Sequence, residues 1–594
     1  PTSTNTLGIE APTKTYNPAC LTPLLRDSVS CSFDVNVLGD SVTQFVGGAW
    51  NNGAPTSTAR AIISDDYDTA AQGNIDACDC DVEAETILTV GPDDYLNIQY
   101  NINVEGTLNV AHTGSIVQSE SSAIVTNNGT INVDVTTPVL QTRDFMVMGS
   151  PMDGETRNDV FDSAFLVLNS TPGNFLPHPE VPTGGTNFAD DNGDFWNSYS
   201  GAINVGEGYI VRPQSGYTDP ANTTYDMTYS LGTLNNGDVT RPIVFNGLAT
   251  NPSGTPNILA NPYASAIDAD QLIADNALIG EVYFWEHLTP PSSSIPGAGG
   301  INFSMGDISM YNTSMALPAA NDPGTTTTPN GVIATAQGFG IKAQAAGTVT
   351  FSNDMRLTSG NTTLRNPEGV DKLTLRVFHQ EYGIGSYAGI AFNPTASEGW
   401  DVGYDTQRLA TAISLFSQLQ DGKEQLAIQT LPSFESGMKI PMGFASQVTA
   451  DTAYTITIAD IAGDNLSQAS VYLIDNVLNT ITDLTQEDYT FRSNEGTFEG
   501  RFTLQFEYEV LGTNDLNQGA FTLYPNPTKD LVTISATTPI TQVAIYDLQG
   551  RLVQTHMGQE TRQLTVTTDK LTAAMYFVTV TTQEGTLTKR LVKQ

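Results

Sequence analysis

The residues best suited to hold a metal ion form a short acidic run, Asp190-Asp191-Asn192-Gly193-Asp194. Asp190, Asn192 and Asp194 alternate around a glycine turn, so their side-chain oxygens could wrap a calcium ion. The distal bidentate acid of an EF-hand is missing, and a solvated acidic turn is the alternative interpretation. Calcium at this run is the one cofactor that the sequence suggests, and otherwise we expect none.

The sequence contains none of the common catalytic motifs built on histidine or serine. The five histidines are dispersed, and none forms His-x-x-x-His or His-Glu-x-x-His. No Gly-x-Ser-x-Gly hydrolase motif occurs. A pair of catalytic carboxylates among the 64 acidic residues stays open, because such pairing is three-dimensional. We expect no catalytic residues and a non-enzymatic protein, with a polysaccharide-active enzyme as the alternative.

The charge balance limits the partners. The 64 acidic residues outnumber the 24 Lys and Arg, which gives a net charge of −40. So negative a surface repels phosphate backbones and anionic lipids, and it argues against binding to nucleic acid or to a membrane surface. No run of about 18 apolar residues occurs, so we predict no transmembrane segment.

The elements that would carry any site are β-strands, and those of residues 33–142 are short. Apolar pairs such as Leu88/Val90 and Leu108/Val110 recur between corners at glycine or asparagine. Short strands with regularly spaced turns indicate a short β-helix-like solenoid, and a plain antiparallel sandwich is the alternative. No terminal cap is obvious, so we expect neighbouring segments to cover its ends. Residues 1–32 predict an N-terminal linker.

An internal repeat follows the solenoid. Met148-Gly149-Ser150-Pro151 aligns with Leu259-Ala260-Asn261-Pro262, and Gly208-Tyr209-Ile210-Val211-Arg212 aligns with Gly338-Phe339-Gly340-Ile341-Lys342. Trp196 and Trp285 lie between the paired motifs. These landmarks predict two copies of a β-rich module, residues 143–250 and 251–365.

Two details of the repeat can be predicted. Asp268 followed by Gln271 resembles a capping box, which predicts a short helix from that point. In the second motif we expect the aromatic residue in the core and the cation at the rim. The alternative is an aromatic-plus-cation glycan site.

Residues 371–510 predict an all-β sandwich, since alternating strands resume there. Leu409, Ile413, Phe416 and Leu419 fall at helical spacing and suggest one helix in this region. Residues 511–520 read as a hinge. The whole chain is therefore expected to be all-β and multidomain.

The last block, residues 521–594, opens on Tyr524-Pro525-Asn526-Pro527 and continues through alternating strands. Val532-Thr533-Ile534 and Tyr576-Phe577-Val578 each place every second side chain on one face. The two prolines remove backbone donors, so the block cannot continue the preceding sheet. It holds seven Lys and Arg against five acids, a net +2, whereas the remainder carries −42. We predict a self-contained C-terminal β-sandwich.

These motifs resemble the type A C-terminal sorting domain of the type IX (Por) secretion system of Bacteroidota. Ala574 departs from the family, in which many members carry glycine. The resemblance implies an immunoglobulin-like fold, recognition by the outer-membrane translocon and its shuttle protein, and cleavage near 511–520 after export. The chain starts at Pro1 without a charged-then-apolar leader, so we expect a signal peptide outside this chain. The residues that carry the signal are Tyr524, Pro525, Asn526, Pro527, Gly550, Tyr576, Lys589, Arg590 and Lys593.

The chain has four cysteines, Cys20, Cys31, Cys78 and Cys80. In an exported protein we expect cysteines to form disulfides and not to remain free thiols. Cys78 and Cys80 would share one face of a strand, so a bridge between them would be strained. We predict two bridges that join the 20–31 segment to the 78–80 strand, with the pairing open. Zinc is the alternative, although no second close pair or nearby histidine supports it.

Residues 40–510 are similar to the C-terminal regions of large flavobacterial cell-surface proteins of the adhesin type, several of which serve gliding or attachment. The resemblance rests on Gly-Ser-Pro, Asn-Pro-Tyr-x-Ser-Ala and Tyr-Phe-Trp-Glu-His. It implies a secreted or surface-anchored adhesin or structural protein, with a glycan-binding protein as a further alternative. Bacteroidota exported proteins also carry O-glycans at Asp-Ser/Thr triplets, which implies sites at Ser28, Ser41, Thr69, Ser163 and Thr452.

Overall fold

The computed structural model describes residues 42–594 apart from 183, 217–222, 252, 325, 362–370, 420–421, 423, 508–520, 559–560 and 583–584. It is 47% strand and 5% helix, which confirms the all-β class. The chain divides into two compact units, residues 1–507 and 508–594. The predicted linker 1–32 and hinge 511–520 lie outside the described residues.

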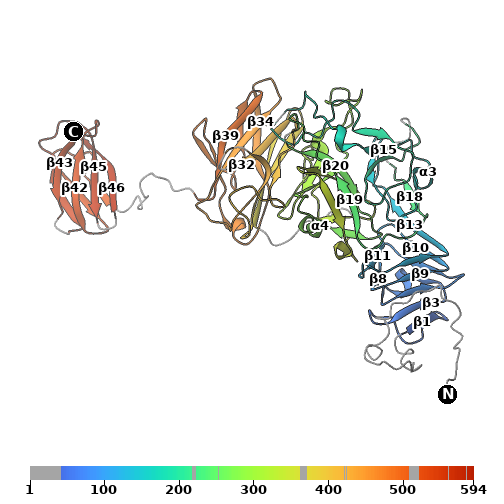
Figure 1. Ribbon diagram of the computed structural model, residues 1–594. Coiled ribbons are helices and arrows are strands. Elements are labelled where there is room, and N and C mark those ends of the chain that lie inside the picture. The colour runs from blue at the N-terminus through green and yellow to red at the C-terminus, as the bar shows by residue number, and fades with distance from the viewer. Residues whose placement is uncertain are drawn as a thin grey trace, which may run out of the picture. The chain divides into compact units, whose positions relative to one another are not determined.

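The first part is a parallel β-helix with three faces (Figure 1). Equivalent strands of successive coils pair in parallel, as Leu88 does with Leu108 and Leu108 with Ile131. All three side chains are fully buried in the interior. The faces consist of β1 (Val42–Val46), β3 (Arg60–Ile63), β6 (Cys80–Val82), β9 (Ile102–Val104) and β12 (Val125–Asn127); β4 (Tyr67–Asp68), β7 (Ile87–Val90), β10 (Thr107–Val110) and β13 (Thr130–Thr136); and β5 (Ile75–Ala77), β8 (Tyr95–Ile98) and β11 (Ser115–Gln118), with β2 (Ala49–Trp50) beside β1 and the helix α2 (Thr69–Gln72) after β4. The predicted solenoid is confirmed and the antiparallel alternative is wrong.

Two corner glycines show why the coils can stack so closely. A Cβ atom on Gly129 would lie 2.0 Å from the carbonyl oxygen of Gly106, and one on Gly106 would lie 2.3 Å from that of Glu83. Any side chain at these corners would push the coils apart, so the glycines seen in the sequence are a packing requirement.

The C-terminal end of the solenoid is covered by the modules that follow. Strand β18 (Asp226–Tyr229) pairs antiparallel with β13. From the second module, Arg356 donates to the carbonyl of Ile116 at 2.6 Å, and Asn361 donates to that of Gly114 at 2.8 Å. These contacts supply the cap that the sequence required.

The two modules share one strand order and one register. In the first, the order is β14-β17-β15-β16, and in the second it is β20-β26-β22-β23-β24. Met148 faces Tyr209 as Leu259 faces Phe339, which are the same positions of the aligned motifs. The bounds are β14 (Met146–Met148), β15 (Leu166–Ser170), β16 (Trp196–Ser198) and β17 (Tyr209–Arg212), then β20 (Thr255–Ala260), β22 (Val282–Trp285), β23 (Ile308–Tyr311), β24 (Ala316–Leu317) and β26 (Gly338–Ala343). This correspondence is what a duplication predicts.

Smaller elements complete the modules. The predicted helix is α4 (Ala269–Asp275), and the Asp268 side chain accepts from the backbone N–H groups of Asp270 and Gln271. The others are β19 (Val239–Ile243), β21 (Ala266–Asp268), β25 (Val332–Ile333), β27 (Gly347–Phe351), β28 (Arg356–Leu357), α3 (Arg157–Val160), η3 (Pro172–Asn174), η4 (Met305–Asp307) and η5 (Asn353–Met355).

The repeated aromatic residues Tyr209 and Phe339 are buried, as predicted. Lys342 is also buried, 3.5 Å from Glu281, so its predicted place at the rim is wrong. Trp196 lies on the fourth strand of its sheet and Trp285 on the third. The two tryptophans are therefore not equivalent positions of the repeat.

Residues 371–506 form one hydrogen-bonded sheet of eleven strands around a single core. The sheet curls until its ends approach, since Tyr489 of β38 donates to Asp475 of β36 at 2.9 Å. The predicted sandwich thus has one continuous sheet. Its strands are β29 (Asp371–His379), β30 (Ile384–Phe392), β31 (Thr406–Gln407), β32 (Ile413–Gln418), β33 (Gln425–Leu431), β34 (Lys439–Ser446), β35 (Thr452–Ala462), β36 (Tyr472–Asp475), β37 (Thr480–Asp483), β38 (Tyr489–Ser493) and β39 (Gly496–Gln505), with η6 (Leu466–Gln468).

The helix suggested at 409–419 is wrong. Ile413–Gln418 is strand β32, and all six of its residues are buried. A strand buried on both faces shows no alternation of apolar and polar residues, so its sequence can imitate helical spacing.

The second unit is a two-sheet sandwich with a core of its own, as predicted. One sheet has the order β40-β41-β44 and the other β43-β42-β45-β46. The strands are β40 (Phe521–Tyr524), β41 (Leu531–Ala536), β42 (Ile540–Tyr546), β43 (Leu552–Met557), β44 (Gln563–Thr567), β45 (Ala574–Thr582) and β46 (Gly585–Lys593).

Candidate functional sites

The C-terminal unit brings the two ends of its sequence motif together. The Asn526 side chain donates to the carbonyl of Arg590 at 2.8 Å and accepts from the N–H of Val592 at 2.9 Å. Thr528 N–H donates to the Val592 carbonyl at 2.8 Å. Tyr524, Pro525, Asn526 and Pro527 are exposed, and Arg590 is exposed on β46. We call this surface, Tyr524–Pro527 with Arg590 and Lys593, the sorting surface.

The remaining predicted signal residues support the fold. Tyr576 is buried and donates to the Thr572 carbonyl at 3.1 Å. The Lys589 ammonium donates to the Phe521 carbonyl at 2.5 Å and lies 5.0 Å from the Phe521 ring centre. Gly550 has φ +76° in the turn before β43, a conformation that favours glycine. These residues hold the sandwich in shape.

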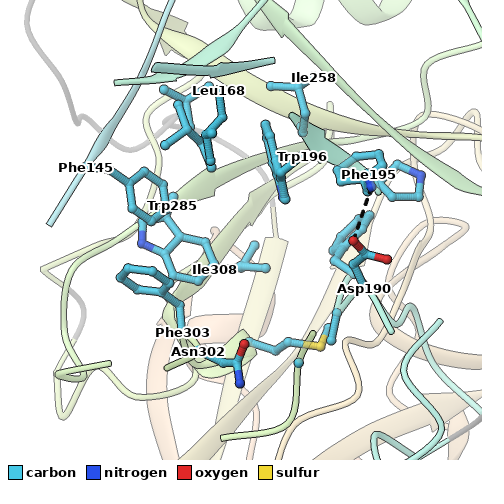
Figure 2. Close-up of a pocket in the computed structure, with 18 of the residues that line it drawn as sticks. Phe145, Leu168, Asp190, Phe195, Trp196, Ile258, Trp285, Asn302, Phe303 and Ile308 are labelled. Carbon is cyan, nitrogen blue, oxygen red and sulfur yellow. Dashed lines mark hydrogen bonds between the residues drawn. The ribbon is translucent and has the colours of Figure 1, made fainter. Parts of the chain in front are cut away.

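A second site is an apolar cavity of about 400 Å³ between the two modules (Figure 2). Strands β15, β16 and β17 of the first module and β20, β22 and β26 of the second contribute side chains to it. Representative lining residues are Leu168, Trp196, Ile210, Ile258, Trp285 and Phe339. Its volume lies within the range of small-molecule sites. We call it the aromatic pocket.

Two groups of aromatic rings form its walls (Figure 2). Phe145 lies 5.3 Å from Trp285 and 4.9 Å from Phe303, between ring centres. On the other wall, Phe195 and Trp196 are 5.0 Å apart and nearly perpendicular. Tilted and edge-to-face pairs at these separations are the favoured arrangements of aromatic rings, so the walls are stable without a ligand.

The polar side chains in the lining are mostly engaged by the protein. Asp190 accepts from the backbone N–H groups of Asn192 at 3.2 Å and Phe195 at 3.3 Å. Asn302 donates to the carbonyls of Ile295 and Gly299, both at 2.9 Å. The Arg212 guanidinium lies 5.5 Å from the Phe303 ring centre, as in a cation–π contact.

A glycine-rich strap, residues 292–302, closes one side of the pocket. Ser292 and Asn302 pair through their backbones at its base. Pro296, Gly297, Ala298, Gly299 and Ile301 of the strap line the cavity. The Asn302 side chain accepts a hydrogen bond from the backbone N–H of Gly299 and donates one to the backbone carbonyl of Gly299. These two bonds give the strap a defined shape.

The predicted calcium ligands form a turn beside the pocket. The side-chain oxygens of Asp190 accept from backbone amides, and the Asn192 side chain accepts from Asp194 N–H at 2.9 Å. Burial raises the pKa of Asp190, against the amide hydrogen bonds that lower it. These contacts match the alternative of an acidic turn, and within the described parts of the chain no three His, Cys, Asp or Glu gather for a metal ion. Calcium binding stays a prediction.

The other predicted sites lie apart. Ser28, Ser41, Cys20 and Cys31 are outside the described residues. A glycan at Thr69 conflicts with the fold, because its hydroxyl is buried and donates to Asp94 at 2.7 Å. Ser163 is exposed. Thr452 is partly buried, and its hydroxyl lies 2.7 Å from His379 Nε2.

The prediction of two disulfides is wrong at Cys80, which is a free and fully buried thiol. Its side chain stacks between Ala61 and Ile102 in the core of the solenoid. A bridge at Cys78 stays a prediction.

Glu286, next to the pocket residue Trp285 in the sequence, has a raised pKa that should make the stability of the protein depend on pH. Burial raises its pKa to about 7, and Asp322 and Asp307 add to the rise while a hydrogen bond from Ser309 opposes it. The folded state therefore holds a proton between pH 4.5 and 7 that the unfolded state has lost, so the free energy of unfolding falls as pH rises through this window.

We expect Glu286→Gln to remove this part of the pH dependence. Relative to the wild type, the variant should gain about 1–2 kcal/mol at pH 8 and little at pH 5, after allowance for partial exposure. Thermal unfolding at both pH values measures the difference. Asp405, whose pKa burial also raises to about 7, should leave a residual slope of the same sign in both proteins. Parallel pH profiles would contradict the prediction.

The geometry defines a nearly all-β protein with an apolar pocket and a separate C-terminal domain. Residues 522–594 match the family described as Secretion system C-terminal sorting domain. The chain is therefore a substrate of the type IX secretion system of Bacteroidota, which exports it to the cell surface or the medium.

Residues 46–506 match the family described as Domain of unknown function (DUF8693). This match covers most of the chain, so the chain belongs to that family. A search of curated proteins found no match. None of the helices in the described ranges is long and apolar enough to cross a membrane.

Of the pocket residues, Trp196, Trp285, Arg212 and Asp190 were singled out from the sequence. Phe145, Phe303 and Ile308 were missed. The aromatic run Tyr283-Phe284-Trp285 was the available signal, but nothing in the sequence places it opposite Trp196.

Proposed function

We propose that this protein works outside the cell as a non-enzymatic binding protein of the adhesin type, with the aromatic pocket as its ligand site. During export, the translocon and its shuttle protein bind the sorting surface. The first unit is the passenger, and the sorting domain directs its export.

The observation that carries the proposal is the joint construction of the pocket. Each of the two modules supplies one tryptophan, Trp196 from β16 and Trp285 from β22. Half-buried aromatic side chains such as those of Trp196 and Trp285, gathered in a concave site of this size, are typical of ligand recognition. The cavity therefore gives the passenger a binding element that neither module could form alone.

A polysaccharide-active enzyme is the second candidate, and Glu286 is the observation that favours it. A carboxyl group with a pKa near 7 is suited to general acid catalysis. Asp307 is close enough to raise the pKa of Glu286, but both oxygens of Asp307 already accept hydrogen bonds, from Thr289 and Asn321. Asp307 is therefore poorly placed to act as the second catalytic group.

The experiment exposes the purified full chain to a panel of oligosaccharides, peptides and small apolar compounds, and it measures both binding and turnover. We expect saturable binding by at least one class, weakened at least tenfold by Trp196→Ala, and no turnover. Trp400→Ala is the matched control, because Trp400 lies outside the pocket. Turnover that Glu286→Gln abolishes would establish the enzyme instead. Binding that Trp196→Ala leaves unchanged would exclude the pocket as the site.

A further inference from the structure

We infer that the ligand of the aromatic pocket is a small apolar molecule that carries aromatic rings, and not a sugar. The inference rests on the proposed function and names the class of ligand. It follows from the balance of polar and apolar groups in the lining.

A sugar ring presents hydroxyl groups around its edge, and each one needs a partner when it leaves water. In the lining, both oxygens of Asp190 accept from backbone amides, and the Asn302 amide is bound within the strap. The Tyr283 hydroxyl donates to Glu281 at 2.9 Å, away from the other lining groups. The Trp285 indole N–H is buried and has no hydrogen-bond partner among the described residues, so it could serve one hydroxyl group, and most others of a bound sugar would lose water without replacement.

An apolar aromatic ligand, in contrast, needs no hydrogen-bond partner and finds apolar surface on the walls of the pocket. The walls offer Phe145, Trp285 and Phe303 on one side and Phe195 and Trp196 on the other (Figure 2). Leu168, Ile258 and Ile308 close the remaining sides with aliphatic surface. Water held against such walls gains little hydrogen bonding, so its release favours an apolar guest. A flat ring can add one more edge-to-face contact to either wall.

The volume of the cavity limits how many aromatic rings the ligand can have. A water molecule occupies about 30 Å³ of liquid volume, so about 400 Å³ corresponds to roughly a dozen waters. A molecule of two or three fused or linked rings has a comparable volume.

The test uses the full chain and N-phenyl-1-naphthylamine, a neutral three-ring probe that fluoresces in apolar surroundings. We expect saturable fluorescence at one probe per chain, with energy transfer from tryptophan. Trp285→Ala should weaken binding at least tenfold, and Phe303→Leu, which keeps apolar volume but removes a ring, should weaken it about threefold or more. Trp400→Ala should bind like the wild type. Neutral and acidic oligosaccharides should fail to displace the probe.

The outcomes separate the two proposals. If oligosaccharides bind in a Trp196-dependent way and the probe does not, the inference is wrong and the proposed binding function stands. If neither class binds in a way that depends on Trp196, Trp285 or Phe303, both are wrong. Because Phe303→Leu is a mild change, it answers the question even if Trp285→Ala fails to fold.

Discussion

Deletion of residues 521–594 should stop export and leave the passenger folded. The sorting domain has a core of its own, which includes Val543, Val578 and Leu591, and none of these residues belongs to a core of the first unit. The chain divides into compact units between Glu507 and Tyr508. Because each unit has its own core, we expect the first unit to fold without the second.

The measurement compares the truncated and full chains in a Bacteroidota host by fractionation of periplasm, cell surface and medium. We expect the truncated chain in the periplasm only. Its folding can be followed through tryptophan fluorescence, because Trp50, Trp196, Trp285 and Trp400 all precede residue 507. Full secretion of the truncated chain would show that another segment carries the export signal.

A point variant separates the sorting surface from the sorting fold. Asn526→Ala removes the hydrogen bonds that join the Tyr-Pro-Asn-Pro segment to Arg590 and Val592. Both hydrogen bonds are exposed, so the domain should stay folded while its export falls severalfold. Tyr576→Phe is the control, since it keeps the buried ring and loses a hydroxyl that lies away from the sorting surface.

The sequence predicted those parts of the fold in which neighbouring elements follow each other along the chain. The solenoid was predictable because each coil pairs with the next, so Leu88, Leu108 and Ile131 recur at a nearly regular interval. The duplication was predictable because the motifs around Pro151 and Pro262 keep their order. The sorting domain was predictable from motifs at both of its ends.

The errors came from residues whose environment depends on distant segments. The spacing of Ile413 and Phe416 suggested a helix, because both faces of β32 are buried by other strands. Lys342 was expected at the rim, but Glu281 and Gln407 reach it in the interior. Cys80 was expected in a bridge, and the inward pleat of β6 buries its sulfur.

The aromatic pocket could be anticipated only in part. Its walls come from strands that the two modules contribute jointly, so Trp196 and Trp285 line one pocket only after both sheets have formed. The sequence offered an aromatic-plus-cation glycan site at the Arg212 motif only as the alternative to core packing. It gave no measure of how many polar groups the protein itself would satisfy, and that balance decides between a sugar and an apolar ligand.

Arg356→Ala should destabilise the junction between the solenoid and the second module by about 3 kcal/mol. Arg356 is buried, and burial lowers its pKa to about 10. It donates to the Ile116 carbonyl at 2.6 Å and to Asn236 at 2.9 Å, and its guanidinium lies 4.8 Å from the Tyr263 ring centre. Alanine would leave the Ile116 carbonyl without this donor and open a void beside the Tyr263 ring.

Hydrogen exchange is the suitable measurement, because a chain with several domains need not unfold in one step. We expect faster exchange in peptides that cover β10, β11 and β13, and little change in residues 371–506. Arg356→Lys keeps the charge but loses the planar group, so it should cost about half as much. Arg492→Ala removes an ion pair to Asp451 in which both side chains are more than half exposed, and it should change stability by less than about 1 kcal/mol. Unchanged protection at β11 in Arg356→Ala would mean that Asn361 and β18 cap the solenoid without Arg356, since Asn361 contacts Gly114 and β18 pairs with β13 independently of it.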